Sequence, residues 1–197
     1  MNHPLRCWCG AVRGHVSLSA RNGRAVCYCK DCQAFAHFLG RAGDVLDDAG
    51  GTDIVATAPS QLRFEQGLEC LACMSLSGRG LLRWYASCCS TPIGNTPRDR
   101  KVHYVGLVHS CLSAQSLDES FGPARMRINT QSAHGRVKAT PVATFAAVLK
   151  LMSVVLPARL SGRYRDNPFF NAQGEPIRTP RVLDRAERSR LKAMTAA

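Results

Sequence analysis

The N-terminus has no apolar run that could serve as a secretory signal, because its first six residues include polar and charged side chains. Without such a signal we expect a cytoplasmic protein, and disulfides are rare in that reducing compartment. The chain nevertheless has ten cysteines in 197 residues. We therefore interpret its closely spaced cysteines as metal ligands rather than as a disulfide framework.

A hydrophobic stretch of transmembrane length is also missing. The longest apolar segment runs from Val142 to Leu156, is interrupted by Lys150 and meets Pro157, short of the roughly 20 residues that a span needs. Apolar residues recur in it every three to four positions: Val142, Phe145, Leu149, Met152 and Leu156. This spacing predicts an amphipathic helix that ends at Pro157 and packs its apolar face on the rest of the protein. Binding to a membrane surface is the alternative.

Cysteine is absent after residue 111, and acidic residues become scarce there. Residues 1–122 carry 12 basic and 10 acidic side chains, whereas residues 123–197 carry 14 and 4, so most of the net charge of +12 lies in the second part. We predict a cysteine-rich zinc-binding domain over residues 1–122 and a basic extension with one or two helices over residues 123–197. Such an extension is suited to binding nucleic acid, an acidic partner or a membrane surface.

Short apolar runs alternate with turn residues over much of the first part, which predicts a mainly β body of short antiparallel strands. The expected strands cover residues 12–18, 25–28, 52–57, 61–64, 71–76, 81–85 and 103–109. The apolar stretch 33–39 predicts one or two helical turns that end at Gly40, and a terminal helix is expected to begin at Asp184.

The central motif consists of Cys27, Cys29 and Cys32 at C-x-C-x-x-C spacing. Thiolates this close in sequence converge on one point when the chain turns, and Zn²⁺ fits soft ligands in tetrahedral geometry. Three protein ligands leave a fourth position for water or substrate, whereas four ligands are typical of structural zinc. The spacing alone leaves open and closed sites equally possible.

A fourth ligand for this site would come from elsewhere, and the candidates are Cys70, Cys73 and His37. A histidine among aromatic residues is more often part of the core or its rim than a ligand. On a strand of period two, Cys70 and Cys73 would face opposite sides. We therefore expect these two cysteines to be buried free thiols.

A second group of cysteines is separated in sequence. Cys7 and Cys9 precede Gly10 in a C-x-C-G motif, which predicts two ligands on a tight turn with Gly10 at positive φ. Cys88 and Cys89 follow an aromatic strand and precede a Thr-Pro pair.

These three motifs, taken in order over residues 5–112, resemble the glutathione-dependent formaldehyde-activating enzyme family, which includes centromere protein V. The resemblance implies a zinc-bound β-tent with two zinc sites, one structural and one of three cysteines near the proposed substrate pocket. It also implies a carbon–sulfur lyase that acts on glutathione or another thiol adduct. The alternatives are a non-catalytic zinc module whose basic tail binds a partner, and a redox or zinc-buffering reservoir.

Matched to the family by position, the structural pair comprises Cys7 and Cys9, and the three-cysteine site comprises Cys27, Cys29 and Cys32. The chain therefore carries every ligand of the three-cysteine site, and the resemblance implies one or two zinc ions.

The last family motif is altered in this chain. Cys89 matches its second cysteine, but Ala86 stands at the first, and Cys88 is an additional thiol. Neighbouring side chains in an extended chain diverge, so the resemblance leaves the fourth structural ligand open between Cys88 and another group. Ser90 replaces the usual glycine, and Tyr28 stands where the family more often has histidine.

The chemistry of the three-cysteine site is constrained by its ligands. Three thiolates make a zinc ion electron rich, which favours delivery of a thiolate over strong Lewis-acid activation. No nearby residue stands out as a general base. Tyr28, Asp31 and His37 are candidates by sequence proximity only, so the catalytic residues stay unassigned.

Overall fold

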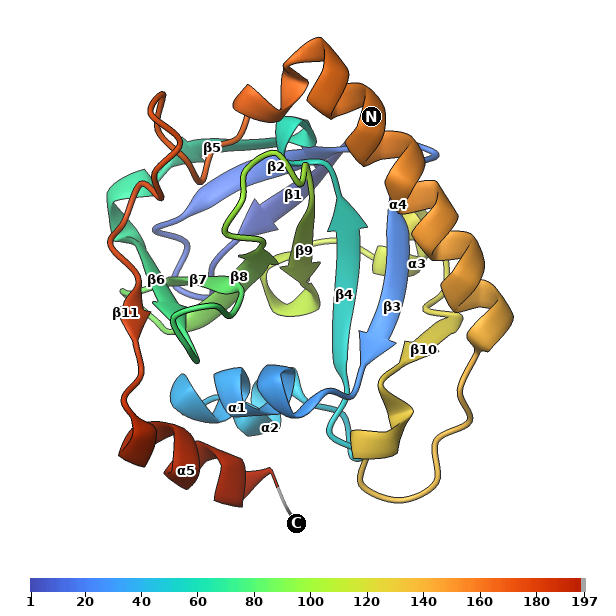
Figure 1. Ribbon diagram of the computed structural model, residues 1–197, viewed down its shortest axis with the longest axis vertical. Coiled ribbons are helices and arrows are strands. Elements are labelled where there is room, and N and C mark those ends of the chain that lie inside the picture. The colour runs from blue at the N-terminus through green and yellow to red at the C-terminus, as the bar shows by residue number, and fades with distance from the viewer. Residues whose placement is uncertain (196–197) are drawn as a thin grey trace.

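The computed structural model describes residues 1–195 as a mainly β protein with two sheets and peripheral helices (Figure 1). The smaller sheet has the strand order β1-β2-β5, and the larger has the order β10-β3-β4-β9-β8-β7-β6-β11. The predicted fold class, a β body followed by a C-terminal helical extension, is confirmed.

The smaller sheet contains β1 (Asn2–Arg6), β2 (Arg13–Ser17) and β5 (Leu62–Gln66). The larger sheet contains β3 (Gly23–Cys27), β4 (Thr52–Thr57), β6 (Leu71–Ser75), β7 (Leu82–Ala86), β8 (Thr91–Thr96), β9 (Val105–Val108), β10 (Met126–Ile128) and β11 (Arg181–Val182). The helices are α1 (Lys30–Phe38), α2 (Ala42–Val45), α3 (Leu117–Phe121), α4 (Pro141–Ser161) and α5 (Arg185–Met194).

Each of the seven expected strands is present, and β4 has the predicted bounds. Strand β8 was not predicted, because its residues are typical of a turn, yet all six are buried. Their polar groups are satisfied inside the core: Asn95 Oδ1 accepts a hydrogen bond from buried Arg83 (3.1 Å), and Thr96 Oγ1 accepts one from Trp84 Nε1 (2.9 Å). Hydrogen bonding thus permits a polar sequence in a buried strand.

The basic extension is built into the body. β10 pairs with β3 and β11 pairs with β6, both in parallel, whereas the strands within residues 1–122 pair antiparallel. Phe169 is fully buried, with its ring centroid 4.9 Å from that of Trp84 and 5.7 Å from that of Phe64. The two parts separated by composition therefore share one sheet and one core.

The helix α4 differs from its prediction in two respects. It continues through Pro157 to Ser161 and ends at Gly162, whose φ is +76°; the buried Ala158 anchors this last turn against the body. Its outer apolar residues do not pack on the body, since Phe145 is 66% exposed.

Because α4 has 21 residues, mean hydropathy of 1.8 over its most apolar window and only 6% of that window buried, it is long and apolar enough to cross a membrane. The prediction that no segment reaches this length was wrong. The prediction assumed that the helix ends at Pro157, but the proline lies one turn before the last residue of α4.

The other helices begin where side chains can cap them. Cys29 is the N-cap of α1, and its Sγ accepts a hydrogen bond from the Cys32 backbone N–H (3.4 Å), so α1 starts earlier than predicted. Asp184 caps α5 as expected, and Glu187 completes a reciprocal capping box.

We predict that Phe169→Ala lowers the free energy of unfolding by about 3–5 kcal/mol, because a fully buried aromatic ring leaves a cavity at the junction of body and extension. Phe145→Ala, a matched change at an exposed position, should alter it by less than about 0.5 kcal/mol. Urea unfolding of both variants measures the difference. A small effect of Phe169→Ala would mean that the extension contributes little to the core.

Candidate metal centres

The three-cysteine centre forms where β3 runs into α1. Cys27 ends the strand, Cys29 caps the helix and Cys32 lies in its first turn. Their Sγ atoms all lie within 4.8 Å of one another. Asn129, which follows β10, donates from Nδ2 to Cys27 Sγ (3.3 Å). The strand-to-helix turn thus brings the thiols together, and the extension adds a hydrogen bond to one of them.

The three thiols of this centre differ in pKa. Hydrogen bonds from Cys29 and Cys32 lower the pKa of Cys27 to about 2. The hydrogen bond to Cys27 raises the pKa of Cys29, and the hydrogen bonds with Cys27 and Cys29 raise that of Cys32, which burial raises further. These shifts favour the deprotonated form at Cys27, and a bound cation would displace the protons of the other two thiols.

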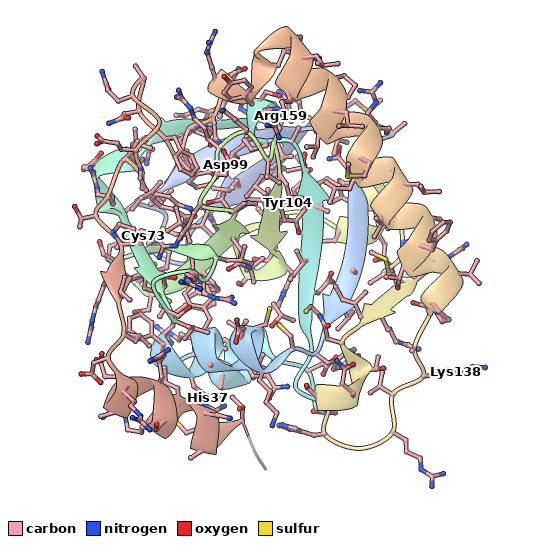
Figure 2. All side chains as sticks on the ribbon, viewed as in Figure 1. His37, Cys73, Asp99, Tyr104, Lys138 and Arg159 are labelled. Atoms are coloured by element: carbon pink, nitrogen blue, oxygen red, sulfur yellow. The ribbon has the colours of Figure 1, made fainter. Side chains whose placement is uncertain are left out.

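Within residues 1–195 no fourth cysteine, histidine or carboxylate joins this cluster. Cys73 is buried in β6, and burial raises the pKa of its thiol to about 12. Cys70 is half-buried, and both are free, close to the expectation of buried free thiols. His37 lies in the last turn of α1, at the other end of the helix from Cys29 (Figure 2).

Two side chains that sequence reasoning did not assign to the site approach the cluster. Arg83 is 2% exposed, and its positive charge lowers the pKa of Cys32 against the other effects. Tyr104 directly precedes β9 and is half-buried (Figure 2). Burial, with the charges of Cys32 and Cys27, raises the pKa of its phenol to about 12, so it stays protonated at neutral pH. Only the aromatic motif signalled Arg83, and no sequence pattern signalled Tyr104.

The general-base candidates are poorly placed. The Tyr28 hydroxyl donates to Asp47 Oδ2 (3.2 Å), and burial raises the pKa of this tyrosine. Asp31 Oδ2 lies 3.6 Å from Arg83 NH2 in a half-buried ion pair. His37 is remote from the thiols, as described above. No catalytic base is assigned.

The second cluster contains Cys7, Cys9, Cys88 and Cys89, whose Sγ atoms lie within 4.8 Å of one another. The Cys7–Cys9, Cys9–Cys88 and Cys88–Cys89 sulfur distances are 3.5, 3.3 and 3.8 Å. A tetrahedral zinc site with Zn–S bonds of about 2.3 Å separates its sulfurs by about 3.8 Å. Four cysteines thus form a closed set that could hold a metal ion.

Cys88 and Cys89 reach the same point because the chain is not extended there. They lie in a turn between β7 and β8, and Ser90 has a φ of +57°. The argument that adjacent cysteines diverge assumed an extended chain, and it fails for this reason. Ser90 and Asn129 are the non-glycine residues with positive φ in the described part, and each adjoins one cluster.

Backbone and hydroxyl donors support this second cluster. Gly10 has a φ of +79°, as predicted, and the Val12 N–H donates to Cys7 Sγ (3.2 Å). The Thr91 hydroxyl accepts from the Trp8 N–H (2.9 Å) and lies 3.0 Å from Cys89 Sγ. Burial raises the pKa of Cys89, but hydrogen bonds from Thr91 and Cys9 outweigh it and lower the pKa to about 6.

A cavity of about 480 Å³ between α1 and α5 borders the residues next to the three-cysteine centre. Its lining includes four cationic side chains, Lys30, Arg185, Arg188 and Lys192. Asp31, the carboxylate in this lining, also pairs with Arg83, which connects the cavity to the buried guanidinium beside Cys32. The cavity next to the centre is therefore strongly basic, although none of the three cysteines lines it.

We predict that the purified protein binds two metal ions and that Cys29→Ser and Cys88→Ser each lose one of them. Each change removes a ligand from a different cluster, and one lost ligand lowers metal affinity steeply. Cys70→Ser is the matched control, because Cys70 belongs to neither cluster, and it should retain both ions. Native mass spectrometry counts the ions; loss of both from either ligand variant would show that the clusters are not independent.

We also predict that Ser90→Gly raises the free energy of unfolding of the metal-loaded protein by about 0.5–1 kcal/mol, because a left-handed backbone costs a non-glycine residue about that much net. Gly10→Ala should lower it by about 1–2 kcal/mol for the same reason. Both are measured by urea unfolding. Destabilisation by Ser90→Gly would mean that the serine side chain supports the turn.

Comparison with known proteins places this architecture in a family. A search of curated proteins found no match. A crystal structure of a Rhodobacter sphaeroides protein aligns with 59% of this chain and 93% of its own, at 21% identity and a TM-score of 0.40. The profile of the family described as "Family of unknown function (DUF6151)" matches residues 1–179, which include both cysteine clusters, α4 and Phe169. The chain belongs to this DUF6151 family.

Proposed function

We propose that this is a zinc protein in which the four-cysteine cluster is structural and the three-cysteine centre binds a thiol. The proposal rests on the difference between the two clusters. One contains four sulfurs, whereas the other contains three and has no further protein donor among the described residues. In zinc proteins a complete set of four ligands is structural, and a set of three leaves a position for an exogenous ligand.

The donor chemistry favours a soft metal such as zinc over hard cations such as Mg²⁺ and Ca²⁺. All seven donors are cysteine sulfurs, which are soft ligands that select zinc, Cu(I) or iron–sulfur clusters. The three sulfur separations of 3.3, 3.5 and 3.8 Å in the four-cysteine cluster are close to the value of about 3.8 Å for tetrahedral Zn–S geometry. When bound, zinc would lower the pKa of a thiol ligand and hold it as a nucleophilic thiolate.

The residues around the centre would hold and orient such a thiol adduct. The hydrogen bond from Asn129 fixes Cys27, and the buried guanidinium of Arg83 offsets the negative charge of the thiolates. Tyr104 keeps its proton at neutral pH and is thus a hydrogen-bond donor, suited to the oxygen of a carbonyl adduct. These roles agree with a carbon–sulfur lyase that forms or cleaves a bond between a thiol and a carbonyl carbon.

The charge of the neighbouring cavity indicates the class of thiol. Four cations and one carboxylate line the cavity between α1 and α5. A thiol that carries carboxylates, such as glutathione, is attracted to this cavity next to the centre, whereas a neutral thiol is not. The proposal therefore names an acidic thiol, in agreement with the family that the cysteine motifs resemble.

The test combines binding with exchange kinetics. Wild-type protein should form a glutathione complex that native mass spectrometry detects. It should also accelerate the reversible addition of glutathione to formaldehyde, which gives the hydroxymethyl adduct and is followed by NMR. Cys29→Ser should lose both properties, while Cys70→Ser keeps them. Arg188→Gln combined with Lys192→Gln should weaken glutathione binding about tenfold and leave binding of 2-mercaptoethanol unchanged.

Failure has a clear signature. If the protein carries two zinc ions and neither binds a thiol nor accelerates the exchange, thiol chemistry at this centre is excluded. The second candidate, a non-catalytic zinc module, would then gain support, since the 14 basic and 4 acidic residues of positions 123–197 favour an anionic partner. Salt-dependent binding of nucleic acid, unchanged in Cys29→Ser, would support it.

A further inference from the structure

The outer face of α4 exposes a continuous apolar surface. Its exposed large hydrophobic residues are Val142, Phe145, Val148, Leu149, Met152, Leu156 and Leu160. At 3.6 residues per turn these positions fall within a stripe about 120° wide that runs the length of the helix. They make up most of the exposed large hydrophobic side chains of the described chain. A surface of this kind marks an interaction site.

The inner face of the same helix is already held by the body. Lys150, near the middle of α4, donates from Nζ to the Asn22 carbonyl oxygen (2.8 Å). Ala147, Leu151 and Val154 line a cavity of about 220 Å³ between the helix and the body. The helix therefore lies along the side of the protein next to β3 and β10 (Figure 1). Its apolar stripe faces away from the body, since the side chains in it are exposed.

The chain segment that contains the stripe carries charge of one sign only. No aspartate or glutamate occurs between Glu119 and Asp166. Seven exposed basic residues lie in this interval: Arg125, Arg127, Arg136, Lys138, Arg159, Arg163 and Arg165. None of the seven forms an ion pair with a carboxylate of residues 1–195. Their charges are thus free for an external anion.

The basic residues lie at both ends of the apolar stripe. Lys138 precedes the helix, and Arg159 lies in its last turn, at the opposite end (Figure 2). Arg159 falls on the same side as the stripe by helical angle. An apolar stripe flanked by cations matches a bilayer surface, where acyl chains lie beneath a layer of anionic headgroups.

We propose that α4 is an interfacial helix that docks this protein on the surface of an anionic lipid bilayer. The outer stripe inserts at the boundary between headgroups and acyl chains, and the basic residues contact lipid phosphates and carboxylates. The helix lies in the plane of the membrane rather than across it, because its Lys150 and its inner face remain bound to the body. This surface is separate from the metal centres, so the proposal does not depend on the thiol chemistry.

Vesicle flotation of the full, metal-loaded protein tests the proposal. The protein should float with vesicles of phosphatidylcholine mixed with phosphatidylserine, bind weakly to phosphatidylcholine alone, and be released by high salt. Phe145→Ser combined with Leu149→Ser should lower the partition coefficient at least tenfold, because two apolar side chains no longer insert. Arg136→Gln combined with Lys138→Gln should lower it about 25-fold, at roughly fivefold for each charge removed.

Matched controls lie elsewhere on the surface. Leu68→Ser changes another exposed apolar residue, and Arg79→Gln changes an exposed basic residue far from α4 in sequence; neither should alter the partition coefficient. Circular dichroism and metal content establish that each variant is folded.

Four outcomes would overturn the proposal. The first is that folded wild-type protein binds neither kind of vesicle. The second is that Phe145→Ser combined with Leu149→Ser binds vesicles as well as the wild type does, which would place the membrane contact elsewhere on the protein. The third is a concentration-dependent dimer, detected by light scattering and abolished by Phe145→Ser with Leu149→Ser, without vesicle binding; the stripe would then join two copies. The fourth is binding that resists alkaline extraction, which would indicate a spanning helix.

Discussion

The structure depends on one electrostatic constraint: thiolates that lie close together repel one another and lose hydration, which destabilises the folded state unless their charge is neutralised. Seven sulfur atoms are gathered into two groups, and the thiolates can be held close together only if protons or a cation neutralise them. One group joins the N-terminal Cys7–Cys9 turn to the β7–β8 turn, which links the small sheet to the large one. The other is built where β3 meets α1. A metal ion in each would connect local turns to the global architecture.

The C-terminal extension completes what the cysteine-rich part begins. It supplies Asn129 to the three-cysteine centre, Phe169 to the main core and α5 to the wall of the basic cavity. The DUF6151 profile runs to residue 179 and thus treats the body and most of the extension as one unit. The helix α4 is the exception, since only its inner face is used by the fold. A helix that keeps an apolar outer face against water is explained most simply by an external apolar partner.

Local strain also concentrates at the two clusters. Ser90 and Asn129 adopt left-handed conformations that usually require glycine, and each adjoins a group of cysteines. Such conformations persist where the surroundings impose them and are common at functional sites. The departures of this chain from the formaldehyde-activating pattern, an additional Cys88 and a Ser90 in place of glycine, are accommodated in one turn. That turn brings Cys88 and Cys89 together with Cys7 and Cys9, so the altered motif still forms a four-cysteine cluster.

The sequence by itself determined the three-cysteine group, the Gly10 turn, most strands of the body and the cap of α5, because each of these has a local signal: ligand spacing, a turn glycine, alternating apolar residues or a capping side chain. Tertiary structure alone decided the rest. Cys88 and Cys89 converge through a backbone turn that no spacing rule anticipates. Asn129 and Tyr104 reach the site through strand pairing and burial. The polar strand β8 exists because Arg83 and Trp84 satisfy its side chains. Only the tertiary structure shows that the apolar face of α4 is exposed. The sequence pattern of an apolar stripe is the same whether the stripe packs in a core or faces the outside.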